Sequence, residues 1–182
     1  METAQQFDQV IALCRHIFQR KLKDYGTSWR IMRPQSITDQ IFIKASRIRA
    51  IETKRVNLVN EGIKPEFVGI VNYGVIGLIQ LALGATTDFK DMDYDEALAL
   101  YDNSLSETKE LMFAKNHDYD EAWRSMRISS YTDLILTKIC RVKQIEDNHG
   151  QTIESEGIDA NYMDMINYAV FGLIKLTFNE GY

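Results

Sequence analysis

The sequence predicts an all-α protein in which two homologous three-helix units pack against each other as a pseudo-dimer. The chain of 182 residues repeats itself at an offset of 94, the step from Tyr25 to Tyr119. Apolar residues recur three and four positions apart along most of the chain, which contains only two prolines. This periodicity is typical of amphipathic helices, and no alternating β-pattern competes with it. A repeat this long exceeds the period of ordinary solenoids and favours two packed units.

The repeat also ranks positions, because one chain shows twice which residues its unit retains. A slip of one residue moves the offset to 95 in the last third of each unit. The retained residues include Trp29/Trp123, Lys44/Lys138, Arg47/Arg141, Glu52/Glu146 and Asn72/Asn167. We therefore divide the chain into a first unit (1–84), a linker (85–93) and a second unit (94–182).

The first unit contains three predicted helices. The stripe that begins at Phe7 predicts a helix over 4–23, with Thr3 and Gln6 as a capping box. A polar turn then leads to a helix over 38–59, for which Ser36 and Asp39 form a second predicted capping box. Pro65, followed by a long apolar run, predicts the start of a third helix that ends near residue 84.

The second unit repeats this order, with helices predicted over 94–115, 132–147 and 159–178. Ser130 and Asp133 repeat the capping pattern of the first unit. Residues 67–87 carry no charge and approach the length of a bilayer span, but the equivalent stretch carries Asp164 and Lys175. A buried central helix therefore explains this stretch better than a membrane segment.

Charge and cysteine usage limit the function classes. The net charge of −5, with both signs dispersed, gives no basic stripe for extended nucleic acid, although a nucleotide-sized ligand remains compatible with it. Cys14 and Cys140 occupy apolar helical positions and do not pair in the repeat, so we expect buried free thiols. Together with an N-terminus unlike a signal peptide, they predict a cytoplasmic protein. Association into a homodimer stays open.

An acid lies on the apolar face of the middle helix in both units. Glu52 shares its face with Ile48, and Glu146 shares its face with Val142. An unpaired buried carboxylate is costly, so each acid should have a partner. One interpretation is an exposed or salt-bridged helix end; the other is a metal-binding or acid-network carboxylate that faces a cleft.

Two cations stand one turn apart on the same helices. Lys44 and Arg47 recur as Lys138 and Arg141, a spacing that suits phosphate oxygens. The alternative is a solvated flank that pairs with acids such as Asp39 or Glu52. The repeated Trp29 and Trp123 follow polar loops, where an indole can cover a base or fill a gap between helices.

The last helix of the second unit presents Asp164 and Asn167 one turn apart, after Glu156. Carboxylates and amides at this spacing, facing acids on another helix, can hold a hard divalent cation. The counterpart of Asp164 in the first unit is Gly69. We therefore expect a complete metal site only in the second unit.

These residues resemble a known family. The segments Lys115–Tyr119, Lys138–Arg141 and Asp164–Ala169, with Trp123, are similar to nucleotide modification associated domain type 1. The resemblance covers nearly the whole chain, once in each half. More distantly, the helix order looks like that of the MazG-like all-α nucleoside triphosphate pyrophosphohydrolases, although their Glu-x-x-Glu pair is absent from residues 138–141.

The resemblance implies a magnesium-dependent site in a MazG-like helical bundle. It implies catalytic roles for Glu146 and Asp164, with Glu156 as a further metal ligand. The substrate contacts would be Lys138, Arg141, Asn167, Trp123, Lys44 and Arg47. We therefore expect a protein that binds a nucleotide or a nucleotide-derived phosphate and hydrolyses it with Mg²⁺. The alternative is a non-catalytic helical module that recognises a protein partner.

Overall fold

The structure is a computed structural model that describes residues 2–54, 62–88 and 90–178. Within these ranges the chain forms six α-helices and two short 3₁₀-helices, and no strand. The all-α prediction is confirmed. The first unit contains α1 (Thr3–Tyr25), η1 (Ser28–Ile31), α2 (Pro34–Lys54) and α3 (Lys64–Leu83). The second contains α4 (Tyr94–Tyr119), η2 (Ala122–Ser125), α5 (Ile128–Asp147) and α6 (Ile158–Phe178).

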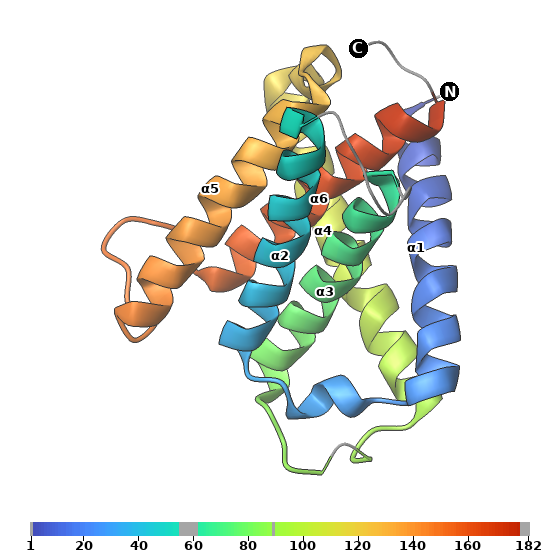
Figure 1. Cartoon of the computed structure of the whole chain (residues 1–182), viewed down its shortest axis with the longest axis vertical. Helices are drawn as coiled ribbons and strands as arrows, with labels where there is room; N and C mark the ends of the chain where they lie inside the picture. Colours follow the sequence, from blue (N-terminus) through green and yellow to red (C-terminus); the bar gives the residue numbers. More distant parts are fainter. Residues whose placement is uncertain (1, 55–61, 89, 179–182) are drawn as a thin grey trace.

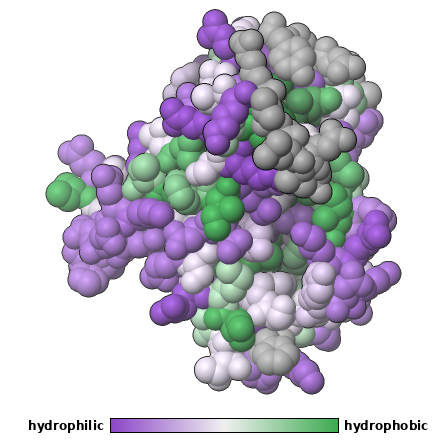
Figure 2. All heavy atoms as spheres, in the orientation of Figure 1, coloured by the Kyte–Doolittle hydropathy of each residue, from purple (hydrophilic) through white to green (hydrophobic). Residues whose placement is uncertain are grey.

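Helices α2, α3, α5 and α6 form one shared bundle, and α1 and α4 pack on α3 and α6 (Figure 1). The hydrophobic core is continuous across both units. Helix α3 is long and apolar enough to cross a membrane, but two thirds of its most apolar window, 67%, is buried inside the protein. Figure 2 shows one face of the molecule, on which hydrophilic side chains predominate and hydrophobic patches are separate. Burial within the bundle accounts for the apolar character of α3.

Glycines allow α3 and α6 to approach closely. A Cβ atom at Gly77 would lie 2.4 Å from a ring carbon of Tyr162. In the reciprocal contact, a Cβ atom added at Gly172 would lie 3.0 Å from the ring of Phe67. Gly77 and Gly172 are equivalent in the repeat, as are Phe67 and Tyr162. The two units therefore meet through a reciprocal interface of the kind that relates the subunits of a symmetric dimer.

Exposed ion pairs follow the same reciprocity between α2 and α5. Lys143 Nζ lies 3.0 Å from Asp39 Oδ1, and Arg49 Nη1 lies 4.0 Å from Asp133 Oδ1. Both aspartates were expected in capping boxes with Ser36 and Ser130. That prediction is wrong, because α2 begins at Pro34 and α5 at Ile128, which places both aspartates inside their helices. The predicted extension of α2 to residue 59 lies outside the described residues.

The predicted capping box at the start of α1 is also wrong. The N-cap residue is Glu2, and Thr3 and Gln6 instead accept hydrogen bonds from Nη2 of Arg124, at 2.6 and 2.8 Å. Thr3 also donates a hydrogen bond to Glu121. These side chains thus join α1 to the second unit.

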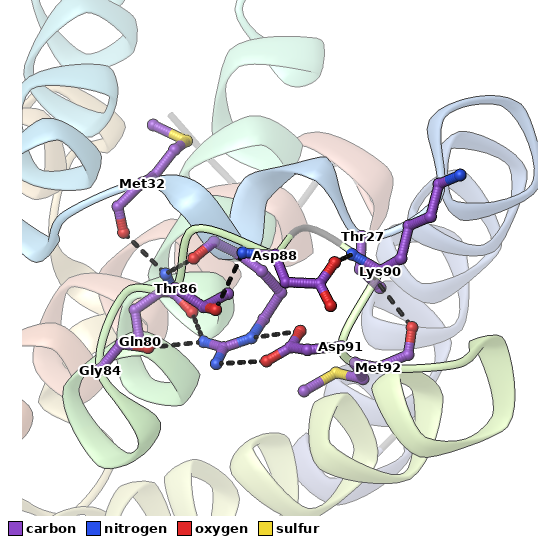
Figure 3. A network of polar contacts seen from close by, with 10 residues as sticks. Thr27, Met32, Gln80, Gly84, Thr86, Asp88, Lys90, Asp91 and Met92 are labelled. Atoms are coloured by element: carbon purple, nitrogen blue, oxygen red, sulfur yellow. Dashed lines mark hydrogen bonds and ion pairs between the residues drawn. The ribbon is translucent and has the colours of Figure 1, made fainter.

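Arg30 anchors the segment between the units. Its buried guanidinium donates hydrogen bonds to Gln80, to the Gly84 carbonyl and to both carboxylate oxygens of Asp91 (Figure 3). The amide of Thr86 in turn donates to the Arg30 carbonyl. The start of the predicted linker is therefore fixed to the first unit by a network of hydrogen bonds.

The repeat retains only part of this network. Gln80 corresponds to Lys175, and both donate to the carbonyl of a methionine, Met32 and Met126 respectively. Lysine has no acceptor atom, so it cannot receive the hydrogen bond that Gln80 accepts from Arg30.

The two cysteines differ in burial. Cys14 is fully buried, whereas Cys140 is exposed, contrary to the expectation that both are buried. Position 140 lies beside the apolar stripe of α5 rather than on it. Both thiols are free.

Candidate functional site

Glu146 and Glu52 lie between the two units. Thr38 donates a hydrogen bond of 2.9 Å to Glu146, and Thr132 donates one of 3.1 Å to Glu52. Burial raises the pKa of both carboxyl groups, while the threonine hydrogen bonds oppose that shift. Both acids thus have the partners that burial requires. These partners are neutral hydroxyl groups across the pseudo-dimer interface.

Asp164 lies elsewhere, between two lysines. Asp164 is 4% exposed as a residue, with Oδ1 2.5 Å from Lys115 Nζ and Oδ2 2.7 Å from Lys138 Nζ. Burial lowers the pKa of Lys115, but the hydrogen bond and charge of Asp164 outweigh this effect and the net pKa is raised. Both carboxylate oxygens therefore receive a charge-assisted hydrogen bond from an ammonium group.

The three predicted metal ligands, Glu146, Glu156 and Asp164, do not form a metal site in this arrangement. Across residues 2–54, 62–88 and 90–178, no group of three His, Cys, Asp or Glu side chains is placed to hold a metal ion. Lysine ammonium groups occupy the positions around Asp164 that a cation would need. The residues present therefore do not fit a carboxylate-bound magnesium ion.

Lys138, Arg141 and Glu156 do come together. They line an open groove of about 870 Å³ between α5 and the segment that precedes α6. Asn161 also lines this groove, and its amide donates to the Gly157 carbonyl at 2.8 Å. Because Lys138 is already bound to Asp164, the groove offers less positive charge than the sequence suggests.

Asn167 and Trp123 contribute to packing in the second unit. The Asn167 amide donates to the Thr108 carbonyl at 3.2 Å. The Trp123 ring, 5% exposed as a residue, stacks on Phe171 with a centroid distance of 4.3 Å. The guanidinium of Arg124 covers the indole at 4.5 Å. Trp123 therefore fills a gap between helices, as one of the two interpretations predicted.

Lys44 and Arg47 share one acid in the first unit. Glu66, at the start of α3, is buried; it pairs with Lys44 at 3.7 Å and more closely with Arg47. The expected pairing with an acid is present, but the acid is neither Asp39, which faces Lys143, nor Glu52, which accepts a hydrogen bond from Thr132. Glu66 has no acidic equivalent in the repeat, where Asn161 stands.

The first unit also contains an open cavity of about 470 Å³ between α1, η1, α2 and α3. Its lining is mainly apolar and aromatic, with two cationic side chains among the described residues. The lining includes Lys21, Trp29, Lys44, Gly69, Tyr73 and Ile76. This size and composition are those of small-molecule sites, which combine an apolar wall with a few polar groups.

One feature of this cavity suits a ligand. Lys44 Nζ lies 5.8 Å from the centroid of the Tyr73 ring, so a cation and an aromatic face are adjacent. Of the cavity residues, the sequence pattern predicted Lys44 as a ligand contact, and Trp29 as a ring that covers a base or fills a gap. The repeat could have pointed to the other cavity residues. Lys21 and Tyr73 recur as Lys115 and Tyr168, whereas Gly69 is replaced by Asp164.

The fold defines a tandem-repeat helical protein with a cavity in its first unit. Residues 21–81 and 115–176 match the family described as nucleotide modification associated domain 1, once in each unit. The match covers more than half of the chain, and the protein belongs to this family. Neither the curated proteins nor the solved structures contain a significant match.

Proposed function

We propose that this protein binds a nucleotide or a nucleotide-derived phosphate in the cavity of its first unit. The observation that carries the proposal is the cavity of about 470 Å³, which brings the cations Lys21 and Lys44 together with Trp29 and Tyr73. The description of the family, a domain associated with nucleotide modification, supports a ligand of this class.

The chemistry of the lining suggests how such a ligand lies. Lysine ammonium groups bind phosphate oxygens as point charges, so the phosphate is expected beside Lys21 and Lys44. A base can pack against the rings of Tyr73 and Trp29, because every base presents an apolar face.

The MazG-like relationship would add magnesium-dependent hydrolysis to this binding. The described residues supply no carboxylate cluster for the metal, so the proposal is restricted to binding. Pyrophosphate or phosphate release from nucleoside triphosphates, measured with and without Mg²⁺, tests hydrolysis separately. Release that depends on both the protein and Mg²⁺ would extend the proposal to catalysis.

Thermal unfolding with a panel of nucleoside mono-, di- and triphosphates tests the binding proposal. A ligand that binds the folded state raises the melting temperature, by mass action. We expect this increase in the wild type and a strong reduction in Lys44→Gln. Arg49→Gln is the matched control, because Arg49 lies on the same helix and does not line the cavity. An absence of response to every nucleotide, or an undiminished response in Lys44→Gln, would contradict the proposal.

The second candidate function is a non-catalytic helical module that recognises a protein. One observation favours it: several charged residues that the repeat retains, including Glu52 and Glu146, join the two units. Retention of these acids thus has a structural explanation that requires no ligand. A flat nucleotide panel would favour this candidate.

A further inference from the structure

The cavity of the first unit has a counterpart in the second unit, and the two copies differ at the point where an anion would bind. Four cavity residues are informative in this comparison. Their equivalents are Lys21/Lys115 and Lys44/Lys138 at an offset of 94, then Gly69/Asp164 and Tyr73/Tyr168 at an offset of 95. Both lysines and the tyrosine are thus retained. Of these four positions, only that of Gly69, which is Asp164 in the second unit, differs.

In the second unit a carboxylate occupies that position. Asp164 accepts hydrogen bonds from Lys115 and Lys138 at 2.5 and 2.7 Å and is almost completely buried. Burial raises the pKa of Tyr168, and the charge of Asp164 adds to this effect because it lies nearby. The second unit therefore shows an anion held between the two lysines and close to the tyrosine.

In the first unit the same position has no side chain. Gly69 lies directly beneath the Lys44 side chain, because a Cβ atom there would be 2.5 Å from Cδ and Cε of Lys44. Lys21 is exposed and has no ion pair among the described residues. Lys44 shares Glu66 with Arg47 at 3.7 Å, so its charge is only partly compensated. The lysine pair thus remains available to an external anion.

A second difference fills the remaining space in the second unit. Ile76, which lines the cavity of the first unit, corresponds to Phe171. The Phe171 ring stacks on Trp123 at 4.3 Å. In the first unit the equivalent indole, Trp29, lines the open cavity. An aspartate and a phenylalanine therefore occupy the space that an anion and a ring would take in the first unit.

We propose that the first unit binds the single phosphate of a nucleoside monophosphate between Lys21 and Lys44, at the position that Asp164 occupies in the second unit. The second unit is then a copy of the site closed by its own carboxylate. This inference rests on the proposed function and deepens it. Two cations line the described part of the cavity, and a monoester phosphate carries a charge of about −2 near pH 7, which they can balance.

The decisive variant is Gly69→Asp, which gives the first unit the carboxylate of the second. The three atoms nearest to the new Cβ atom all belong to the flexible end of Lys44, and this lysine side chain can move aside without displacing backbone. Gly69→Asn is the matched control, because it has the same shape without the charge. Lys21→Gln removes one phosphate contact at an exposed position where a folding defect is not expected. Arg49→Gln, outside the cavity, should bind as the wild type does.

Isothermal titration with AMP, GMP, CMP and dTMP, and with inorganic phosphate as a separate probe, measures the effect. We expect one monophosphate bound per wild-type chain and an affinity lower by about tenfold or more in Gly69→Asp and Lys21→Gln, the size of a lost charge-assisted contact. Gly69→Asn should lose clearly less than Gly69→Asp. Melting curves without ligand establish that each variant is folded.

The outcomes separate the inference from the function on which it rests. Equal losses in Gly69→Asp and Gly69→Asn would mean that bulk blocks the site, and would overturn the anion position while nucleotide binding stands. Binding of triphosphates but not monophosphates would overturn the ligand class alone. A wild type that binds none of the nucleotides would overturn both.

Discussion

The hydroxyl of Tyr101 donates a hydrogen bond of 2.7 Å to Oδ1 of Asn72, so both ends of this buried amide are satisfied. The equivalent asparagine, Asn167, retains the other bond, from its amide to a main-chain carbonyl, but its Oδ1 has no partner among the described residues. The repeat explains the difference, because Tyr101 corresponds to Phe7, which has no hydroxyl.

Phe7→Tyr should therefore stabilise the protein if the added hydroxyl reaches Asn167. A recovered buried hydrogen bond contributes about 1 kcal/mol, which raises the melting temperature by about 2–4 °C in a chain of this size. Tyr101→Phe is the converse change and should destabilise by about 1–3 kcal/mol, because it leaves Asn72 Oδ1 unsatisfied. Thermal unfolding of both variants checks the prediction, and a destabilised Phe7→Tyr would show that the site lacks room for the oxygen.

Replacing each of three glycines by alanine should show, from the loss of stability, how tightly each position is packed. Gly77→Ala forces a Cβ atom to 2.4 Å from the Tyr162 ring and should destabilise by about 1–3 kcal/mol. Gly172→Ala meets Phe67 at 3.0 Å, so its cost should be smaller and partly offset by the better helix propensity of alanine. The nearest atoms to a Cβ at Gly69 belong to the flexible end of Lys44, so Gly69→Ala should be the mildest of the three. Chemical denaturation gives the ranking, and a Gly77→Ala as stable as Gly69→Ala would contradict it.

Replacing Glu52 and Glu146 by glutamine should change how stability depends on pH. Burial raises the pKa of both acids in the folded protein, so the folded state binds more protons than the unfolded state between the ordinary and the raised pKa. Their contribution to stability therefore falls as pH rises through that window. The double variant should be more stable than the wild type at pH 7, and this difference should shrink below about pH 4, near the ordinary pKa of glutamate. Melting temperatures at several pH values test this, and a difference independent of pH would refute it.

The two thiols should differ in reactivity. Burial raises the pKa of Cys14 to about 12, whereas Cys140 is exposed. Because the thiolate is the reactive form, a thiol reagent should label one cysteine per folded chain and two after denaturation. Cys140→Ser should remove the labelling of the folded protein. Rapid labelling of that variant would indicate that α1 opens readily.

The helices were predictable because apolar spacing depends only on local sequence, and the repeat shows the same spacing twice. The starts of α2 and α5 were not, since Ser-x-Thr-Asp fits a capping box as well as an ordinary helical turn. Pro34, a residue favoured in the first turn of a helix, was the signal that could have placed α2 correctly.

The candidate site was less predictable than the fold. The repeat identified Gly69 and Asp164 as a difference between the units, but it did not show what that difference does. The partner Lys115 is 49 residues from Asp164 in sequence and reaches it only through the packing of α4 on α6. In the same way, the repeat showed that Glu146 is equivalent to Glu52 without showing that Thr38 of the other unit binds it.

The reciprocal hydrogen bonds of Thr38 and Thr132 join two halves of a single polypeptide. Two separate subunits would lose such an interface on dilution, because their association follows mass action. Here the two halves belong to one chain, so the effective concentration of one half around the other is fixed and does not depend on the protein concentration. The assembly should therefore unfold at the same temperature in dilute and concentrated solution.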